Sequence, residues 1–92
     1  MTADMRPRLA AKARLRADPR GTGHLLLYPE HGLALTDTAV AVLRLCTGER
    51  SVDEIVGELA ARYSDAPREA IARDVVGFLD ALAVRGLLVT AP

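Results

Sequence analysis

The chain has 92 residues, half of them hydrophobic, and its formal net charge at pH 7 is zero. This length supports one small domain, and no apolar run approaches the ~20 residues that a membrane-spanning helix requires. The single cysteine, Cys46, cannot form an internal disulfide, and the N-terminal residues lack the apolar segment of a signal peptide. We therefore expect a cytoplasmic domain without a membrane contact.

The charges are unevenly distributed along the chain. Residues 1–20 carry six basic residues against two acidic ones, whereas the rest of the chain carries six against ten. Such a basic segment attracts nucleic acid or an acidic partner, or it is simply a solvated terminus. Residues 1–8 are polar and have no periodicity, so we expect them to be disordered and the folded domain to span 9–92.

Turn-forming residues separate three apolar segments in the first part of the chain. We interpret these segments as the strands of a three-stranded antiparallel meander, at residues 13–17, 24–28 and 33–35. The first segment lies in a stretch, 9–18, that is also compatible with a helix. The last strand follows a Pro-Glu-His-Gly turn at 29–32 and is predicted to lie at the sheet edge, with unpaired backbone groups.

Three helices are predicted to follow: from Thr36 or Asp37 to Leu45, from Ser51 to about Tyr63, and over roughly 68–85. Ser51 and Glu54 have the spacing of a capping box, and Gly48 and Gly86 suit the left-handed position after a helix. The apolar tail at 87–89 fits a short strand or a packed extension. The expected fold class is α+β and winged-helix-like, with the meander preceding a three-helix bundle.

The third helix has a wider apolar surface than one contact face requires. One stripe consists of Ile71, Val75, Phe78 and Leu82, and an adjacent stripe consists of Ala72, Val76, Leu79 and Ala83. Either this helix is central and covered on two sides, or one stripe lines a groove.

Residues suited to catalysis or metal binding do not cluster in the sequence. His24 and His31 lie in or beside the hairpin turn, without Cys or acidic residues at metal-ligand spacing. Cys46 falls on the apolar face of the first helix, which favours a buried side chain over a nucleophile. We therefore expect neither an enzyme nor a bound metal or cofactor.

The winged-helix-like arrangement is common among DNA-binding proteins, but the third helix has an unsuitable surface. Its three arginines are balanced by three acidic residues, and it contains no Asn, Gln or Lys that could read bases. We therefore do not expect a nucleic-acid partner.

Several short motifs resemble the PqqD family in their order and spacing. They are LLYPE at 26–30, LTDTA at 35–39, LCTG at 45–48 and SVDEI at 51–55. Asp74-Val75 and Phe78-Leu79 continue the match, so the resemblance covers roughly residues 7–90.

This resemblance implies a function and a fold. PqqD proteins are peptide chaperones in the biosynthesis of pyrroloquinoline quinone (PQQ). They bind the ribosomally made precursor peptide PqqA and present it to the radical-SAM enzyme PqqE. Their fold is the leader-peptide recognition element, in which the peptide adds as a strand to the third β-strand and packs against the third helix.

The residues themselves suggest how such a peptide would bind. The edge strand, with Leu33, Ala34 and Leu35, can pair with an extended peptide by β-augmentation, and Gly32 at the end of the preceding turn is counted with the peptide-binding residues. The apolar surplus of the third helix would then supply a groove, for which we choose Ile71, Val75, Phe78 and Leu79. Arg73 and Asp74 either fix the peptide's register by charge or belong to a solvated helix face.

Two other interpretations remain open at this point. A recognition domain for another modified peptide would differ only in its partner, and a winged-helix regulator would bind duplex DNA. The expected working state is a monomer that can dimerise through its exposed sheet edge.

Overall fold

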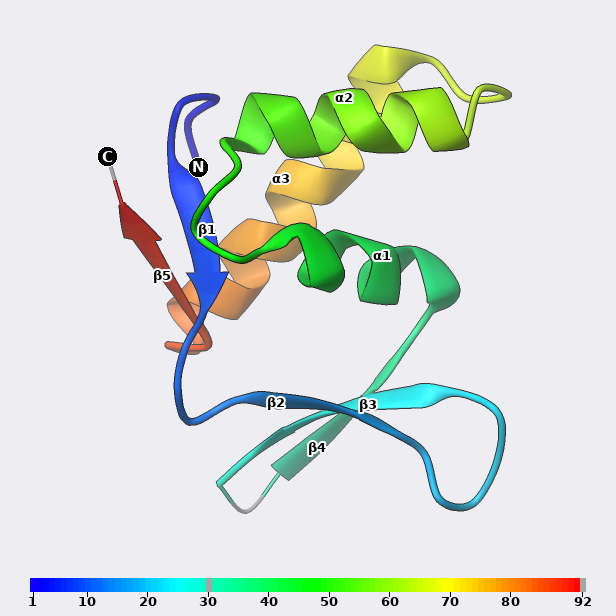
Figure 1. Ribbon diagram of the computed structural model, residues 1–92, viewed down its shortest axis with the longest axis vertical. Coiled ribbons are helices and arrows are strands. Elements are labelled where there is room, and N and C mark those ends of the chain that lie inside the picture. Colours follow the sequence, from blue (N-terminus) through cyan, green and yellow to red (C-terminus); the bar gives the residue numbers. More distant parts are fainter. Residues whose placement is uncertain (30, 92) are drawn as a thin grey trace.

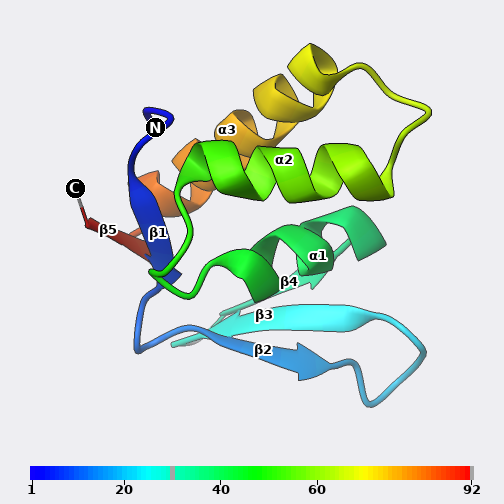
Figure 2. The same ribbon diagram turned by 45° about the horizontal axis from the view of Figure 1, so that its top comes forward.

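The computed structural model describes residues 1–29 and 31–91, which form two antiparallel sheets and three helices (Figure 1). In chain order the elements are β1 (Arg6–Leu9), β2 (Arg14–Ala17), β3 (His24–Tyr28), β4 (His31–Leu35), α1 (Asp37–Leu45), α2 (Val52–Arg62), α3 (Arg68–Val84) and β5 (Leu88–Ala91). The three-stranded sheet lies beneath α1, and α2 lies on the opposite side of α1 (Figure 2).

The predicted meander is confirmed, with strand order β2-β3-β4. Leu26 on the central strand pairs with Leu15 on one side and Leu33 on the other, and its side chain is fully buried. Because side chains alternate along a strand, Leu27 points to the opposite face and is exposed. β4 begins at His31, two residues earlier than expected, and the rings of Tyr28 and His31 lie 5.3 Å apart across the turn.

The expected disorder of residues 1–8 is wrong, because much of this segment is folded. β1 pairs antiparallel with β5, and the side chain of Pro7 is fully buried. The backbone N–H of Val52 donates to the carbonyl oxygen of Met5 at 2.8 Å, which ties the segment to the start of α2. The apolar tail is accordingly a strand. Its partner lies at the other end of the chain, so local composition gave no signal for the pairing.

The predicted helix caps are confirmed. The Thr36 hydroxyl accepts from the N–H of Ala39 at 3.1 Å, so Thr36 rather than Asp37 is the cap. Ser51 and Glu54 form the reciprocal capping box, with distances of 3.1 and 2.9 Å. The hydrogen bond from the Ser51 backbone N–H to the Glu54 carboxylate, followed by a hydrogen bond with the Ser51 side chain, lowers the pKa of Glu54. Gly86 follows α3 with φ of 73°, as its predicted left-handed position requires.

The core is aliphatic and receives residues from the three-stranded sheet, all three helices and the C-terminal segment. Its most deeply buried large side chains include Leu26, Ile55, Leu59, Leu79, Leu82 and Leu87. Each fully buried side chain of this size contributes about 1.5–3 kcal/mol through removal of apolar surface from water. Packing of α2 against α3 holds the helical layer together.

Candidate functional site

The outer edge of β4 is open to another backbone. β4 pairs with β3 along one side, and in the described part of the chain no strand pairs with its other side. Leu33 and Leu35 are half-buried and pack against the core, whereas Gly32 and Ala34 are exposed. The strand is therefore fixed from one face while its free edge keeps unpaired hydrogen-bonding groups.

A cavity of about 410 Å³ lies where α1, the end of α2 and the start of α3 meet. Three of its lining residues, Val42, Leu59 and Val75, are buried core side chains. Ala39, Tyr63, Ala66, Ile71 and Phe78 are half-buried around them. The volume falls within the ~300–1,000 Å³ typical of pockets for small ligands.

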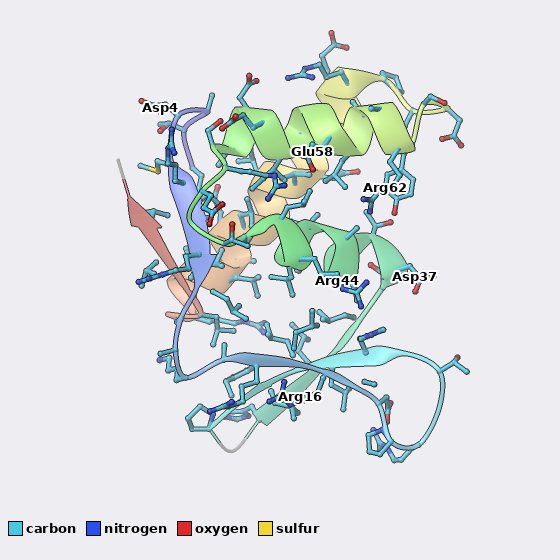
Figure 3. The ribbon with its side chains drawn as sticks, in the orientation of Figure 1. Asp4, Arg16, Asp37, Arg44, Glu58 and Arg62 are labelled. Atoms are coloured by element: carbon cyan, nitrogen blue, oxygen red, sulfur yellow. The ribbon has the colours of Figure 1, made fainter. Side chains whose placement is uncertain are left out.

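The mouth of the cavity is polar and adjoins the edge strand. Thr36, which follows β4 directly, is an exposed lining residue, as are Thr38, Asp65 and Asp74. Asp37 and Arg62 lie at this same end of α1 and α2 (Figure 3). The open edge of β4 therefore leads through Thr36 to the mouth of the cavity.

The structure gathers most of the predicted groove residues. Ile71, Val75 and Phe78, three of the four residues of the first apolar stripe, line the cavity together with Asp74, whereas Leu82 is buried in the core. Leu79 does not line the cavity, and its side chain is fully buried in the core.

Arg73 also lies outside the cavity lining. Its Nε is 3.9 Å from Asp74 Oδ1, and the two side chains are 80% and 81% exposed. Gly32, Leu33, Ala34 and Leu35 share the neighbouring strand but do not line the cavity.

Sequence reasoning missed the contributions of α1, α2 and the loop between α2 and α3. The sequence places the groove on the third helix alone, whereas Val42 lies on α1, Leu59 on α2, and Asp65 and Ala66 in the loop that follows α2. The helical periodicity marks Val42 and Leu59 as buried, but no sequence signal shows that their faces meet at a cavity.

The groups with reactive potential lie elsewhere. Cys46 is buried, its Sγ donates to the Val42 carbonyl oxygen at 3.3 Å, and burial raises the pKa of its thiol to about 12. Within residues 1–29 and 31–91, no group of three or more His, Cys, Asp or Glu side chains could hold a metal ion. None of the described helices is sufficiently long and apolar to span a membrane.

The fold and site together define an α+β domain, an antiparallel meander followed by three helices, with an open edge strand beside an apolar cavity. Residues 23–88 match the sequence profile of the family described as coenzyme PQQ synthesis protein D (PqqD). The chain belongs to the PqqD family.

Individual relatives agree with this assignment. A protein of Bradyrhizobium diazoefficiens named PqqA binding protein is 46% identical over 86 residues, which cover 94% of this chain and 82% of that protein. The solution structure of the PqqD part of Methylobacterium extorquens PqqCD, described as a stand-alone recognition element for ribosomally synthesised, modified peptides, superposes with a TM-score of 0.75. The sequence identity to that structure is 40%, and the match covers 90% of this chain and 87% of the other.

The crystal structure of PqqD from Xanthomonas campestris is also similar, with a TM-score of 0.58 and 33% sequence identity. The match covers 86% of this chain and 87% of that one. The α+β fold with antiparallel strands followed by three helices is thus shared with solved PqqD structures.

Proposed function

We propose that this chain is a non-enzymatic peptide chaperone of PQQ synthesis, which binds the precursor peptide PqqA by strand addition to β4 and presents it to PqqE. The observation that carries the proposal is the open edge of β4, which leads through Thr36 into the apolar cavity. The name of the Bradyrhizobium relative, PqqA binding protein, supports the choice of peptide.

The two parts of the site have different roles in this proposal. Backbone hydrogen bonds to β4 would supply affinity for any extended segment, because every peptide has the same N–H and C=O groups. The cavity would supply selectivity, because only a side chain of suitable shape fills it. Peptide binding would also cover the edge that otherwise exposes unpaired groups.

Titration of the isotope-labelled chain with synthetic PqqA, followed by NMR, tests this proposal. We expect saturable shifts that cluster at residues 32–36 and 70–83. Absence of shifts at high peptide excess would contradict PqqA as the partner. A repeat with precursor peptides of other modification pathways, and with duplex DNA, would then identify which alternative applies.

A matched pair of substitutions on α3 tests the cavity. Val75→Asp, a natural choice from sequence alone, is unsuitable because Val75 is only 3% exposed and belongs to the core. Ile71→Ser instead alters a half-buried cavity residue and should weaken PqqA binding about five- to fiftyfold through lost apolar contact. Val84→Ser is the control, because Val84 is 89% exposed near the other end of the helix. Equal affinities for the two variants would exclude the cavity from peptide binding.

The basic N-terminal region is a candidate surface for PqqE. Arg6 and Arg8 line a second hollow, of about 350 Å³, beside β5, and Arg14 and Arg16 are exposed on β2. A charged surface of this kind accelerates encounter with an acidic partner. The variant Arg14→Glu/Arg16→Glu should therefore associate with PqqE more slowly while PqqA affinity stays unchanged. An unaltered association rate, measured by surface plasmon resonance, would exclude β2 as the docking surface.

A further inference from the structure

The charge at the cavity mouth has no role in the strand-addition mechanism. Asp65, in the loop after α2, and Asp74, on α3, bring two carboxylates to the lining, and no Lys or Arg is among the lining residues. Asp37 and Arg62 lie at this same end of the helices, and their opposite charges offset each other (Figure 3). An apolar interior thus opens through an acidic rim.

The two carboxylates are available to a ligand. In the described part of the chain Asp65 forms no salt bridge, and Asp74 has only the 3.9 Å contact with Arg73. Both partners of that contact are about four-fifths exposed, so water screens it and a closer cation can replace it.

This combination fits one class of side chain. Lysine and arginine have a long apolar stem that packs against hydrophobic surface and a cationic end that stays polar. The stem would contact residues such as Ile71 and Phe78, and the cation would form charge-assisted hydrogen bonds with Asp65 and Asp74. An acidic side chain would meet like charges, and a small apolar one would leave the cavity incompletely filled.

We propose that the cavity is a specificity pocket for one lysine or arginine side chain of the bound peptide, held by Asp65 and Asp74. This inference rests on the proposed peptide binding but not on the identity of the peptide. Since Thr36 joins β4 to the cavity, the cationic residue would lie at the end of the paired peptide segment that is next to Thr36.

Selection from a library of randomised short peptides tests the pocket independently of PqqA. With the unaltered chain as bait, we expect Lys and Arg to be enriched at one peptide position. The enrichment should disappear with Asp65→Asn/Asp74→Asn and persist with Glu69→Gln. Glu69 is the matched control because it is an exposed acid on α3 outside the cavity lining.

The selected peptide allows a quantitative second step. The double Asn variant should bind it about three- to tenfold more weakly, as expected for two partly exposed charge pairs. Replacing the selected Lys or Arg of the peptide by Met keeps an apolar stem but removes the charge. The unaltered chain and the double Asn variant should then bind the peptide with equal affinity. Both Asp residues are exposed, so the Asn variants should fold normally.

The outcomes separate this inference from the proposed function. No cationic preference, or one that persists in the double Asn variant, overturns the pocket, even if PqqA binds. A preference that depends on the two Asp residues supports the pocket, even if titration shows that PqqA itself does not bind and the partner is another peptide.

Discussion

The start of α2 depends on a single serine. Ser51 supplies the hydroxyl that accepts from Glu54 N–H, and its own N–H donates to the Glu54 carboxylate. Ser51→Ala removes the first bond and leaves a free N–H, so we expect a loss of about 1 kcal/mol in the free energy of unfolding. Ser64→Ala, in the exposed turn after α2, should change it by less than about 0.5 kcal/mol. Urea denaturation of both variants measures the difference, and equal midpoints would contradict the capping role.

Because of Cys46, the free energy of unfolding should depend on pH in the alkaline range. Burial raises the pKa of its thiol to about 12 in the folded chain, whereas an unfolded thiol titrates near ~8.5. Below the unfolded pKa both states keep the proton and the thiol has no pH effect. Above it only the unfolded state ionises, so stability falls as pH rises from about 8.5 toward 12.

The comparison with Cys46→Ala isolates this effect from other alkaline titrations. Between pH 8 and 10, the unaltered chain should lose about 1–2 kcal/mol more stability than the variant, the value expected when ionisation is confined to the unfolded state. Parallel stability curves for the two proteins would show that the folded thiol ionises as readily as the unfolded one.

Among the elements, β1 shows how a polar segment becomes part of the fold. Only one of its side chains, Pro7, is buried, while Arg6 and Arg8 on either side are exposed. The strand is held by pairing with β5, and Met5, just before it, accepts the hydrogen bond from Val52. A pattern of one apolar residue between charges carries too little signal to predict a strand.

The substitution Pro7→Asp tests whether this strand belongs to the cooperative fold. It places an unpaired carboxylate at a fully buried position, which should cost at least about 3 kcal/mol of stability. Arg8→Asp makes the same kind of change on the exposed side of β1 and should cost less than about 1 kcal/mol. Thermal unfolding distinguishes the two, and similar melting temperatures would indicate a frayed segment.

For the whole molecule, the open edge of β4 matters both to the proposed peptide binding and to self-association of the free chain. An exposed strand edge can pair with another copy when its proper ligand is absent. We therefore expect concentration-dependent dimers of the free chain, which a peptide bound at β4 should suppress.

Sedimentation velocity over a range of concentrations, with and without excess PqqA, measures this association. Ala34→Lys places a charge on the exposed side of β4 and should keep the chain monomeric, because edge lysines oppose strand pairing. Val84→Lys adds the same charge on α3, far along the chain from β4, and should leave dimerisation unchanged. Dimers that persist with Ala34→Lys or with bound peptide would use another surface.

The local elements could be read from the amino-acid order alone. Period-two alternation, turn residues and capping side chains are short-range effects, so the meander, the Thr36 and Ser51 caps and the left-handed Gly86 were all predictable. Helical spacing also placed Ile71, Val75 and Phe78 on one apolar stripe of the third helix, and the structure places all three at one cavity.

Features that join distant segments could not be read in this way. The pairing of β1 with β5 connects the two ends of the chain, and the cavity combines Val42, Leu59 and Asp65 with α3. Helical periodicity shows that Leu79 and Phe78 both lie on apolar faces, but only the tertiary packing of α3 buries Leu79 completely and leaves Phe78 at the cavity. Periodicity records which residues avoid water, whereas the crossing of helices decides which of them meet.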